Sequence, residues 1–449
     1  MNFAPPVLEV IERLERNDPA LTDIQISSPL VLKALENNNS TQVTHVDINL
    51  SRFSMSEISD FVSVLSLRDS RIRHLTVNNK SLSDDNKLQH FLEGLKGITT
   101  TVRLETLRLQ RIELCHECEA SALRDFCFQN RTTVKVLEVG IGGDGVGSAK
   151  GFHDILMLNN LQTLYLTVSK NVNLERMREW SDCFPILSRD STKVKELHFT
   201  GNSGNFTFFV QHMFPRMTCL KRLKLSPFHV NWVMHYFVQA MELHGQGLEE
   251  LTVTMSTIRF ASLAPAVTNL KALAIDATQS QQTEEDITED FLTILRSSTQ
   301  LSKLRIHHRC MPKRHLLQLC SLLSTHYTNL HTLDLIAYCP DVDEECYEAY
   351  FKILDSNPIV SSQVTFVRDD TVALHRAELK CLSNKIQPQR LLRDATPLAL
   401  WPHMLSILGK RRRHPSMVFS LLQEKAGDLI PTTTPRINGH AVNYFAQTS

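Results

Sequence analysis

The chain repeats a short pattern of hydrophobic and polar positions, apolar-x-x-apolar-x-apolar, along most of its length. Side chains alternate between the two faces of a β-strand, so the pattern predicts a short strand with one buried face. The copies begin at Leu21, Val43, Ile72, Leu104, Val134, Leu161, Val194, Leu220, Leu248, Leu270, Leu301, Leu330 and Ser361. We therefore expect thirteen strands, of which the last, SSQVTF, follows the pattern least closely.

The segments between these strands carry a second pattern, with apolar residues three and four positions apart. That spacing predicts amphipathic helices that bury one side. Successive strands begin about 28 residues apart on average, which leaves room for a helix in each repeat. The segments that show the helical pattern best are 56–67, 85–96, 119–130, 231–245, 288–298, 314–326 and 345–357. Strands that alternate with helices in this way predict a parallel sheet with right-handed crossovers.

An Asn, Asp or Ser together with a Thr recurs just before the strands, as at 130–133 and 190–192, and suits a helix end that turns into a strand. With these turns, residues 17–368 resemble the ribonuclease-inhibitor-like class of leucine-rich-repeat proteins. The resemblance implies an α/β solenoid, a horseshoe of about 13 strand–helix repeats with a parallel concave sheet and convex helices. Several copies carry Val or Ile for Leu, and the Asn or Cys expected after the strand is mostly missing, so we expect loops of uneven length.

An open solenoid needs caps over its terminal repeats. Residues 1–20 are expected to form an N-terminal helical cap, because PPVLEVIERLER reads as a short helix that starts at a proline. The repeats then occupy residues 21–370. Three helical patterns interrupted by prolines predict a helical C-terminal cap over residues 371–429, and the polar end, 430–449, is expected to be disordered.

The C-terminal segment carries a second resemblance. Leu391-Leu392, the run 397–402 and the run 419–422 resemble the C-terminal module of a group of leucine-rich-repeat proteins from unicellular algae, which brings no known activity. The helices of this segment cap the last repeat in one interpretation and bind an adaptor in the other. The basic run 410–414 is either a localisation or phosphate-binding patch or a set of cations at a helix C-terminus.

Composition narrows the class of partner. Lys+Arg and Asp+Glu both number 48, and a nucleic-acid-binding protein needs a basic face or stripe, so we expect no nucleic-acid partner beyond a local patch. The 10 cysteines are too sparse for a disulfide scaffold, and neither a secretory signal nor a membrane span is recognisable. We expect a monomeric cytoplasmic protein with no membrane contact, with the nucleus as the alternative location.

The motifs that suggest chemistry are incomplete. Gly140, Gly142 and Gly145 form GxGxxG after a strand, but the next strand ends without the carboxylate of a dinucleotide site, so we expect a strand-to-helix loop there. Residues 115–118, Cys-His-Glu-Cys, have the spacing of half a zinc site, and no second CxxC exists. No nucleophile is paired with a base at a recognisable spacing. We predict no cofactor, no metal and no enzyme.

Side chains between the apolar positions of each strand point to the open, concave side. Among them, Tyr165, His198, Arg222 and Lys224 place aromatic rings beside cations, residue types that are enriched at protein interfaces. A column of this kind is also polar simply because it meets water. The predicted partner-binding residues are Arg108, Glu138, Tyr165, Glu196, His198, Arg222, Lys224, Arg305 and Asp334.

The fold analogy favours a non-enzymatic scaffold that binds a partner protein on the concave face. One alternative is a substrate receptor of a ubiquitin ligase, although residues 1–20 are too short for the adaptor-binding box that normally precedes the repeats. The other is a GTPase-activating regulator resembling the Ran GTPase activator, which supplies a catalytic Arg from a loop beside the strands. Arg52 and Arg111 are expected in such loops, with no family motif around either.

Overall fold

The computed structural model describes residues 7–365, apart from 39–41, 68–69, 79–84, 99–103, 115, 143–159, 170–192, 202, 229–233, 256–259, 279–283, 299, 328, 358 and 360. Two compact units are present, Met1–Cys381 and Leu382–Ser449. The predicted C-terminal cap, the polar end, the segment that resembles the algal module and the basic run all lie outside the described residues. Everything below concerns the first unit.

One parallel sheet of thirteen strands runs through the first unit in chain order. Every strand pairs only with the strands before and after it, which is the arrangement of a solenoid. The strands are β1 (Asp23–Ile26), β2 (His45–Asn49), β3 (His74–Asn78), β4 (Thr106–Leu114), β5 (Val136–Ile141), β6 (Thr163–Val168), β7 (Glu196–Thr200), β8 (Arg222–Phe228), β9 (Glu250–Met255), β10 (Ala272–Ala277), β11 (Lys303–His308), β12 (Thr332–Ala337) and β13 (Ser361–Thr365). The α/β leucine-rich-repeat solenoid predicted from the pattern is confirmed.

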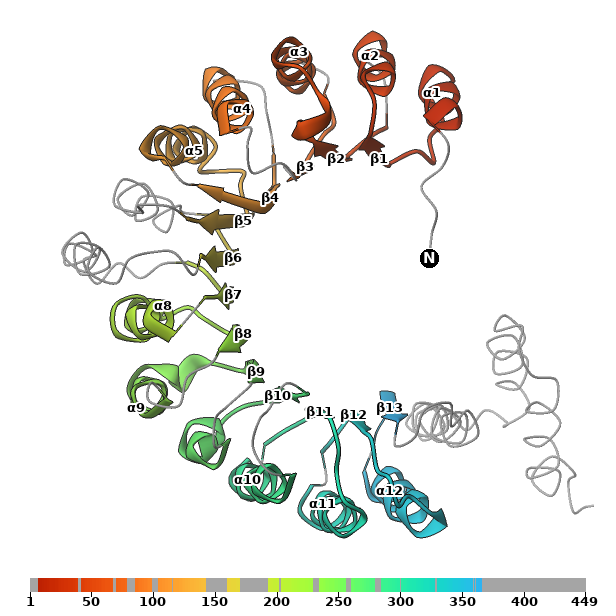
Figure 1. Ribbon diagram of the computed structural model, residues 1–449, viewed down its shortest axis with the longest axis vertical. Helices are drawn as coiled ribbons and strands as arrows, with labels where there is room; N and C mark the ends of the chain where they lie inside the picture. Colours follow the sequence, from red (N-terminus) through yellow and green to blue (C-terminus); the bar gives the residue numbers. More distant parts are fainter. Residues whose placement is uncertain are drawn as a thin grey trace, which may run out of the picture. The chain divides into compact units, whose positions relative to one another are not determined.

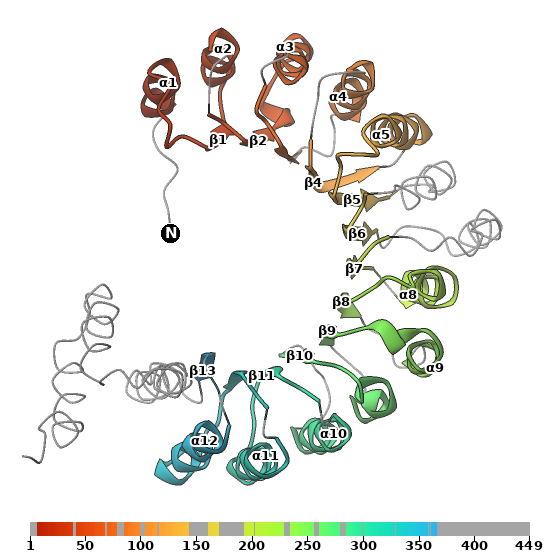
Figure 2. The same cartoon turned by 180° about the vertical axis from the view of Figure 1, so that it is seen from behind.

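The helices lie on the outer side of the curved sheet, which leaves its inner side open (Figures 1 and 2). The described helices are α1 (Val7–Glu15), α2 (Pro29–Asn37), α3 (Met55–Ser66), α4 (Asp85–Gly97), α5 (Glu117–Gln129), α8 (Ser203–Phe208), α9 (Met234–His244), α10 (Glu284–Ser297), α11 (Lys313–His326) and α12 (Glu344–Ser356). Shorter turns replace or extend them at η1 (Leu50–Arg52), η2 (Phe209–Met213), η3 (Phe214–Arg216), η4 (Gly245–Gly247) and η5 (Phe260–Val267). None of these helices is long and apolar enough to cross a membrane.

The core is a continuous layer between the sheet and the helices. The apolar positions of the strand pattern are buried, and helix residues such as Phe61 and Phe91 meet them from outside, with ring centroids 6.3 Å apart. Phe199 of β7 packs on Phe209, at 4.8 Å between centroids. Burial of each large apolar side chain stabilises the fold by about 1.5–3 kcal/mol. The alternation read from the sequence therefore decides which sheet face stays exposed.

The turn residues before the strands act as expected at several helix ends. The Asn130 side-chain amide donates to the Phe126 carbonyl at 2.9 Å, and the Thr133 hydroxyl donates to the Asn130 carbonyl at 3.1 Å. The buried Ser298 hydroxyl likewise donates to the Ile294 carbonyl at 2.8 Å. Backbone N–H groups also donate to the Phe126 and Asn130 carbonyls, so these side chains add a second donor at the turn that follows the helix.

Two expectations about local structure are wrong, and both concern β4 and β5. Strand β4 continues to Leu114, so Arg111 lies inside a strand and not in a loop. The register between the two strands shifts between Arg108 and Glu113, which brings the Ile112 carbonyl oxygen within 2.3 Å of where a Cβ on Gly140 would stand. Gly140 thus belongs to β5, and close packing of two backbones explains this glycine.

Candidate partner-binding surface

The sheet register gathers the outward-facing side chains into rows that cross strands β1 to β12. The middle row consists of Gln25, Asp47, Thr76, Arg108, Glu138, Tyr165, His198, Lys224, Thr252, Ala274, Arg305 and Asp334. The first row consists of Asp23, His45, His74, Thr106, Val136, Thr163, Glu196, Arg222, Glu250, Ala272, Lys303 and Thr332. All nine predicted partner-binding residues fall in these two rows.

A third row precedes the strands, and we call it the starting edge. Its members are joined by backbone hydrogen bonds from each repeat to the one before, such as Lys221 N–H to the Lys195 carbonyl at 2.8 Å. They are Thr22, Thr44, Arg73, Glu105, Lys135, Gln162, Lys195, Lys221, Glu249, Lys271, Ser302 and His331. The starting edge borders the first row, so its charges add to those of the concave face.

At the centre of the middle row, Tyr165 is packed between a cation and a second aromatic ring. The Arg108 guanidinium carbon lies 5.1 Å from the Tyr165 ring centroid, and the His198 ring centroid lies 4.1 Å from it on the next strand. The Arg108 guanidinium also lies 3.9 Å from the Glu138 carboxylate. Contacts on both sides hold the tyrosine ring in one orientation while part of it stays exposed.

Glu196 joins the two rows. Its carboxylate accepts from His198 Nε2 at 2.8 Å and from the Arg222 guanidinium at 2.6 Å. Burial raises the pKa of Glu196, but these two hydrogen bonds outweigh burial, so the pKa lies below its usual value. Arg108, Glu138, Tyr165, Glu196, His198 and Arg222 therefore form one connected set across β4 to β8. With Lys224, which stands next to His198 in the middle row, they make up the central cluster.

The other two predicted residues form a separate pair. Arg305 of β11 donates to the Asp334 carboxylate of β12 through Nε at 2.9 Å and Nη2 at 2.8 Å. The Asp334 side chain is only 9% exposed, whereas that of Arg305 is 57% exposed. The pair thus fixes the guanidinium at one end and leaves its outer edge facing solvent.

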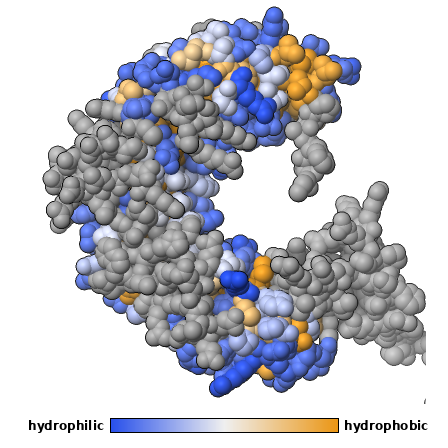
Figure 3. Space-filling view, in the orientation of Figure 1, coloured by the Kyte–Doolittle hydropathy of each residue, from blue (hydrophilic) through white to orange (hydrophobic). Residues whose placement is uncertain are grey.

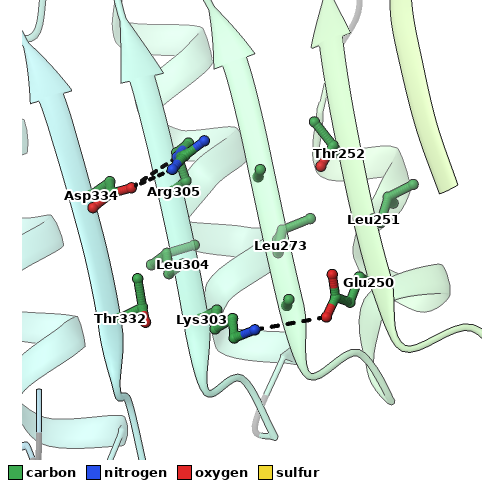
Figure 4. Close-up of a pocket in the computed structure, with 11 residues that line it drawn as sticks. Glu250, Leu251, Thr252, Leu273, Lys303, Leu304, Arg305, Thr332 and Asp334 are labelled. Atoms are coloured by element: carbon green, nitrogen blue, oxygen red, sulfur yellow. Dashed lines mark hydrogen bonds and ion pairs between the residues drawn. The ribbon is translucent and has the colours of Figure 1, made fainter. Parts of the chain in front are cut away.

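Beside this pair the sheet is hollowed above β10 (Figure 4). The hollow has a volume of about 210 Å³, and its floor includes Ala272 and Ala274, where most other strands carry larger side chains in these rows. The Glu250–Lys303 ion pair, 3.8 Å, closes one side of it. Ligand pockets usually enclose about 300–1,000 Å³. The hollow is therefore large enough for one side chain of a partner. The sequence pattern did not predict it.

Near the N-terminal end the same rows carry two stacked histidines. The rings of His45 and His74 lie 4.0 Å apart, Asp23 lies 3.2 Å from His45, and the Thr106 hydroxyl lies 3.0 Å from His74 Nδ1. Burial and the neighbouring His45 lower the pKa of His74 below its usual value. The spacing of the two histidines in the sequence, 29 residues apart, did not predict that their rings would stack.

The described residues give no support to a metal centre. No group of three or more His, Cys, Asp or Glu side chains among them is arranged to hold a metal ion. Cys115 of the CxxC lies outside the described residues, as does Gly145 of the glycine motif. Cys127 is fully buried, and burial raises the pKa of its thiol to about 12.

Hydropathy distinguishes one further surface. Figure 3 shows mostly hydrophilic residues on the visible part of the first unit, with an apolar patch over its α1–α2 end. Leu8 of α1 is 71% exposed and Leu30 of α2 is 61% exposed. Helices α1 and α2 lie on the outer side of the sheet, away from the concave rows (Figure 1).

Comparison with known proteins yields structural likeness only. No family model matches the chain, and no curated protein matches it. A chain in the crystal structure of the yeast Rad7–Elc1 complex aligns at 12% identity with a TM-score of 0.40, over 81% of this chain and 85% of that one. A chain in the TLR13–ssRNA13 complex aligns at 12% identity with a TM-score of 0.36, over 79% of this chain but only 44% of that one. The fold assignment rests on the sheet and helices themselves.

Proposed function

We propose that this chain is a non-enzymatic scaffold that binds a partner protein on its concave face, through the central cluster. The observation that carries the proposal is Tyr165, partly exposed on the concave side of the sheet and held between Arg108 and His198. Tyrosine and arginine are the residue types that most often dominate binding energy at protein interfaces. The concave rows provide them on the face of the sheet opposite to the described helices (Figure 1).

Preorganisation supports the proposal further. Binding requires ordering of interface side chains, at about 0.5–1.5 kcal/mol for each flexible side chain. In the central cluster, Arg222 and His198 are already held by Glu196, and Arg108 lies beside Glu138. Much of that ordering has therefore occurred before a partner arrives. The Arg305–Asp334 pair and the hollow above β10 extend the same face for a larger partner.

The alternatives have less support. The GTPase-activator hypothesis needs an arginine in a loop beside the strands. Arg111 does not meet this requirement, because it lies within β4. Arg52, in the short turn η1 after β2, is the remaining candidate of the two. The ubiquitin-ligase receptor hypothesis stays a prediction, as do the monomeric state and the choice between cytoplasm and nucleus.

Affinity purification from the source cell, followed by mass spectrometry, tests the proposal. The wild-type chain is compared with the variant Tyr165→Ala/Arg222→Glu/Lys224→Glu. The matched control is Tyr338→Ala/Arg314→Glu/Lys352→Glu, which makes the same chemical changes at exposed residues outside the rows. Thermal unfolding of all three proteins verifies that each one folds.

We expect a protein that the wild type and the control retain and that the central variant loses by at least about tenfold, a loss of about 1.4 kcal/mol. Retention of that protein by the central variant would contradict the assigned site. Absence of any protein that depends on the central cluster would contradict the scaffold proposal itself.

A further inference from the structure

Positive charge gathers at the middle of the concave face although the whole chain is neutral. On β7, β8 and the starting-edge residue before each lie Lys195, Lys221, Arg222 and Lys224. Arg222 pairs with Glu196 of β7, and Lys221 pairs with Glu249 on the starting edge. Four cations against these two carboxylates leave a net charge of +2. We call the four cations the basic patch.

Two lysines of the basic patch have no partner. Lys195 and Lys224 are exposed, and neither makes an ion pair or a side-chain hydrogen bond within the described part of the chain. The remaining lysines and arginines of the three rows, as far as the structure describes them, all have partners. Lys221 and Lys271 share Glu249 at 3.0 Å each, Lys135 meets Glu105 at 2.6 Å, and Arg73 donates to backbone carbonyls. The two unpartnered lysines are thus an exception to the charge pairing elsewhere on this face.

The unpaired charges lie next to other cations. Lys195 and Lys221 are neighbours on the starting edge, and Lys224 follows Arg222 by two residues on the same face of β8. Like charges side by side on a sheet destabilise it. An anionic partner would remove that repulsion and gain ion pairs at the same time, which favours a negatively charged ligand at this place.

The surroundings of the basic patch decide the class of ligand. On β6 the rows present Thr163 and Tyr165, and on β9 they present Glu250. Since strands lie about 4.8 Å apart, the patch is roughly 10 Å wide and is bordered by a carboxylate on one side and an aromatic ring on the other. A nucleic-acid backbone needs a longer stripe with several phosphate contacts, whereas two lysines without partners can pair with two carboxylates. The dimensions fit a short acidic segment of a protein.

We propose that the partner contributes an acidic peptide segment, whose carboxylates bind Lys195 and Lys224 and whose neighbouring aromatic side chain contacts the part of Tyr165 that stays exposed. The inference rests on the proposed function and adds the chemistry of the partner. It makes Lys195, which was not among the residues predicted from the sequence, a binding residue.

Fluorescence anisotropy with the full chain tests this proposal. The probe is a fluorescein-labelled ten-residue peptide of alternating Glu and Asp with one central Phe, and its counterpart replaces each Glu by Gln and each Asp by Asn. The test variant is Lys195→Gln/Lys224→Gln. The matched control, Lys135→Gln/Lys271→Gln, removes the same charge from two starting-edge lysines that already have carboxylate partners.

We expect the acidic peptide to bind the wild type at least about tenfold more tightly than the amide peptide, with affinity that falls as salt is raised. The test variant should weaken binding at least about tenfold, and the control less than about twofold. Equal binding of both peptides, or equal weakening by both variants, would overturn the proposal.

A second probe separates the classes of ligand. If a ten-nucleotide single-stranded DNA binds more tightly than the peptide and depends on Lys195 and Lys224, the ligand is a nucleic acid and the acidic-segment proposal is wrong. If neither probe binds while the purified cellular partner still depends on the central cluster, the scaffold function stands and only the proposed chemistry of the partner fails.

Discussion

At the scale of residues, the concave face is organised by contacts between neighbouring repeats. Tyr165, His198 and Glu196 come from two consecutive strands, and Arg108 reaches the same cluster from β4. Strand alternation was enough to predict which side chains share the face. It could not predict their pairing, because most of these contacts join residues of different repeats, and the rotamers of the contacting side chains depend on one another. The hollow was missed because it arises from two alanines, which become notable only beside their larger neighbours in the register.

Gly140 provides the first residue-scale prediction. A methyl group at this position would meet the backbone oxygen of Ile112 at 2.3 Å, and neither strand can move without disturbing the sheet. We expect Gly140→Ala to lower the free energy of unfolding by about 1–3 kcal/mol, measured by urea denaturation. Gly97→Ala is the control, since nothing lies within 4 Å of its Cβ position. Equal stability of the two variants would show that the strands are not so close.

His74 provides a second prediction, for pH dependence. Burial and the charge of His45 lower its pKa in the folded chain, so the unfolded chain takes up this proton more readily. The free energy of unfolding should therefore fall as the pH decreases through the range below about 6.5, the usual histidine pKa. Melting temperatures at pH 7.5 and 5.5 should differ less for His74→Gln than for the wild type. An unchanged difference would mean that other groups determine this pH dependence.

At the scale of elements, the strands were easier to predict than the helices. A six-residue apolar pattern repeated thirteen times defines the strands by itself, whereas several repeats contain short or irregular helices. The segment that begins at Ser203 passes from α-helix into a π-turn and a 3₁₀ turn within 14 residues, and η5 takes the place of a full helix. Pro215 and Pro265 lie in these turns, where a proline prevents a regular α-helix.

Helix α3 offers a prediction at this scale, because its N-terminus carries a complete capping box. The Glu57 N–H donates to the Ser54 hydroxyl at 3.3 Å, and the Glu57 carboxylate accepts from the Ser54 N–H at 2.7 Å. We expect Ser54→Ala to lower the free energy of unfolding by about 1 kcal/mol. Ser63→Ala, on the exposed side of the same helix, should change it by less than about 0.5 kcal/mol. A loss at Ser63 as large as that at Ser54 would argue against the cap.

At the scale of the whole solenoid, each repeat is supported by its neighbours alone, since every strand pairs only with the adjacent ones. The sequence predicted this architecture because the strand pattern recurs along the chain at a nearly regular spacing. The concave surface is equally a property of the array, since the central cluster uses five consecutive strands. No single repeat holds enough of these side chains to form it.

Deletion of one whole repeat tests the modular architecture. Removal of residues 272–302 joins Lys271 directly to Lys303. Lys303 starts β11 at the position that corresponds to Ala272 at the start of β10, so the strand register is kept. We expect a folded protein with the same shape of far-ultraviolet circular dichroism spectrum and a lower melting temperature, because one set of interfaces between neighbours is lost. Loss of cooperative unfolding would contradict the nearest-neighbour description.

The most direct test of the central claim is hydroxyl-radical footprinting of the purified chain with its captured partner. Oxidation of each side chain is compared between the free chain and the complex. We predict that Tyr165 and His198 become protected, while the exposed Leu8 and Leu30 on the outer helices react as before. Protection of Leu8 and Leu30 with unchanged oxidation of Tyr165 would place the partner on the apolar patch at α1 and α2 and contradict binding on the concave face.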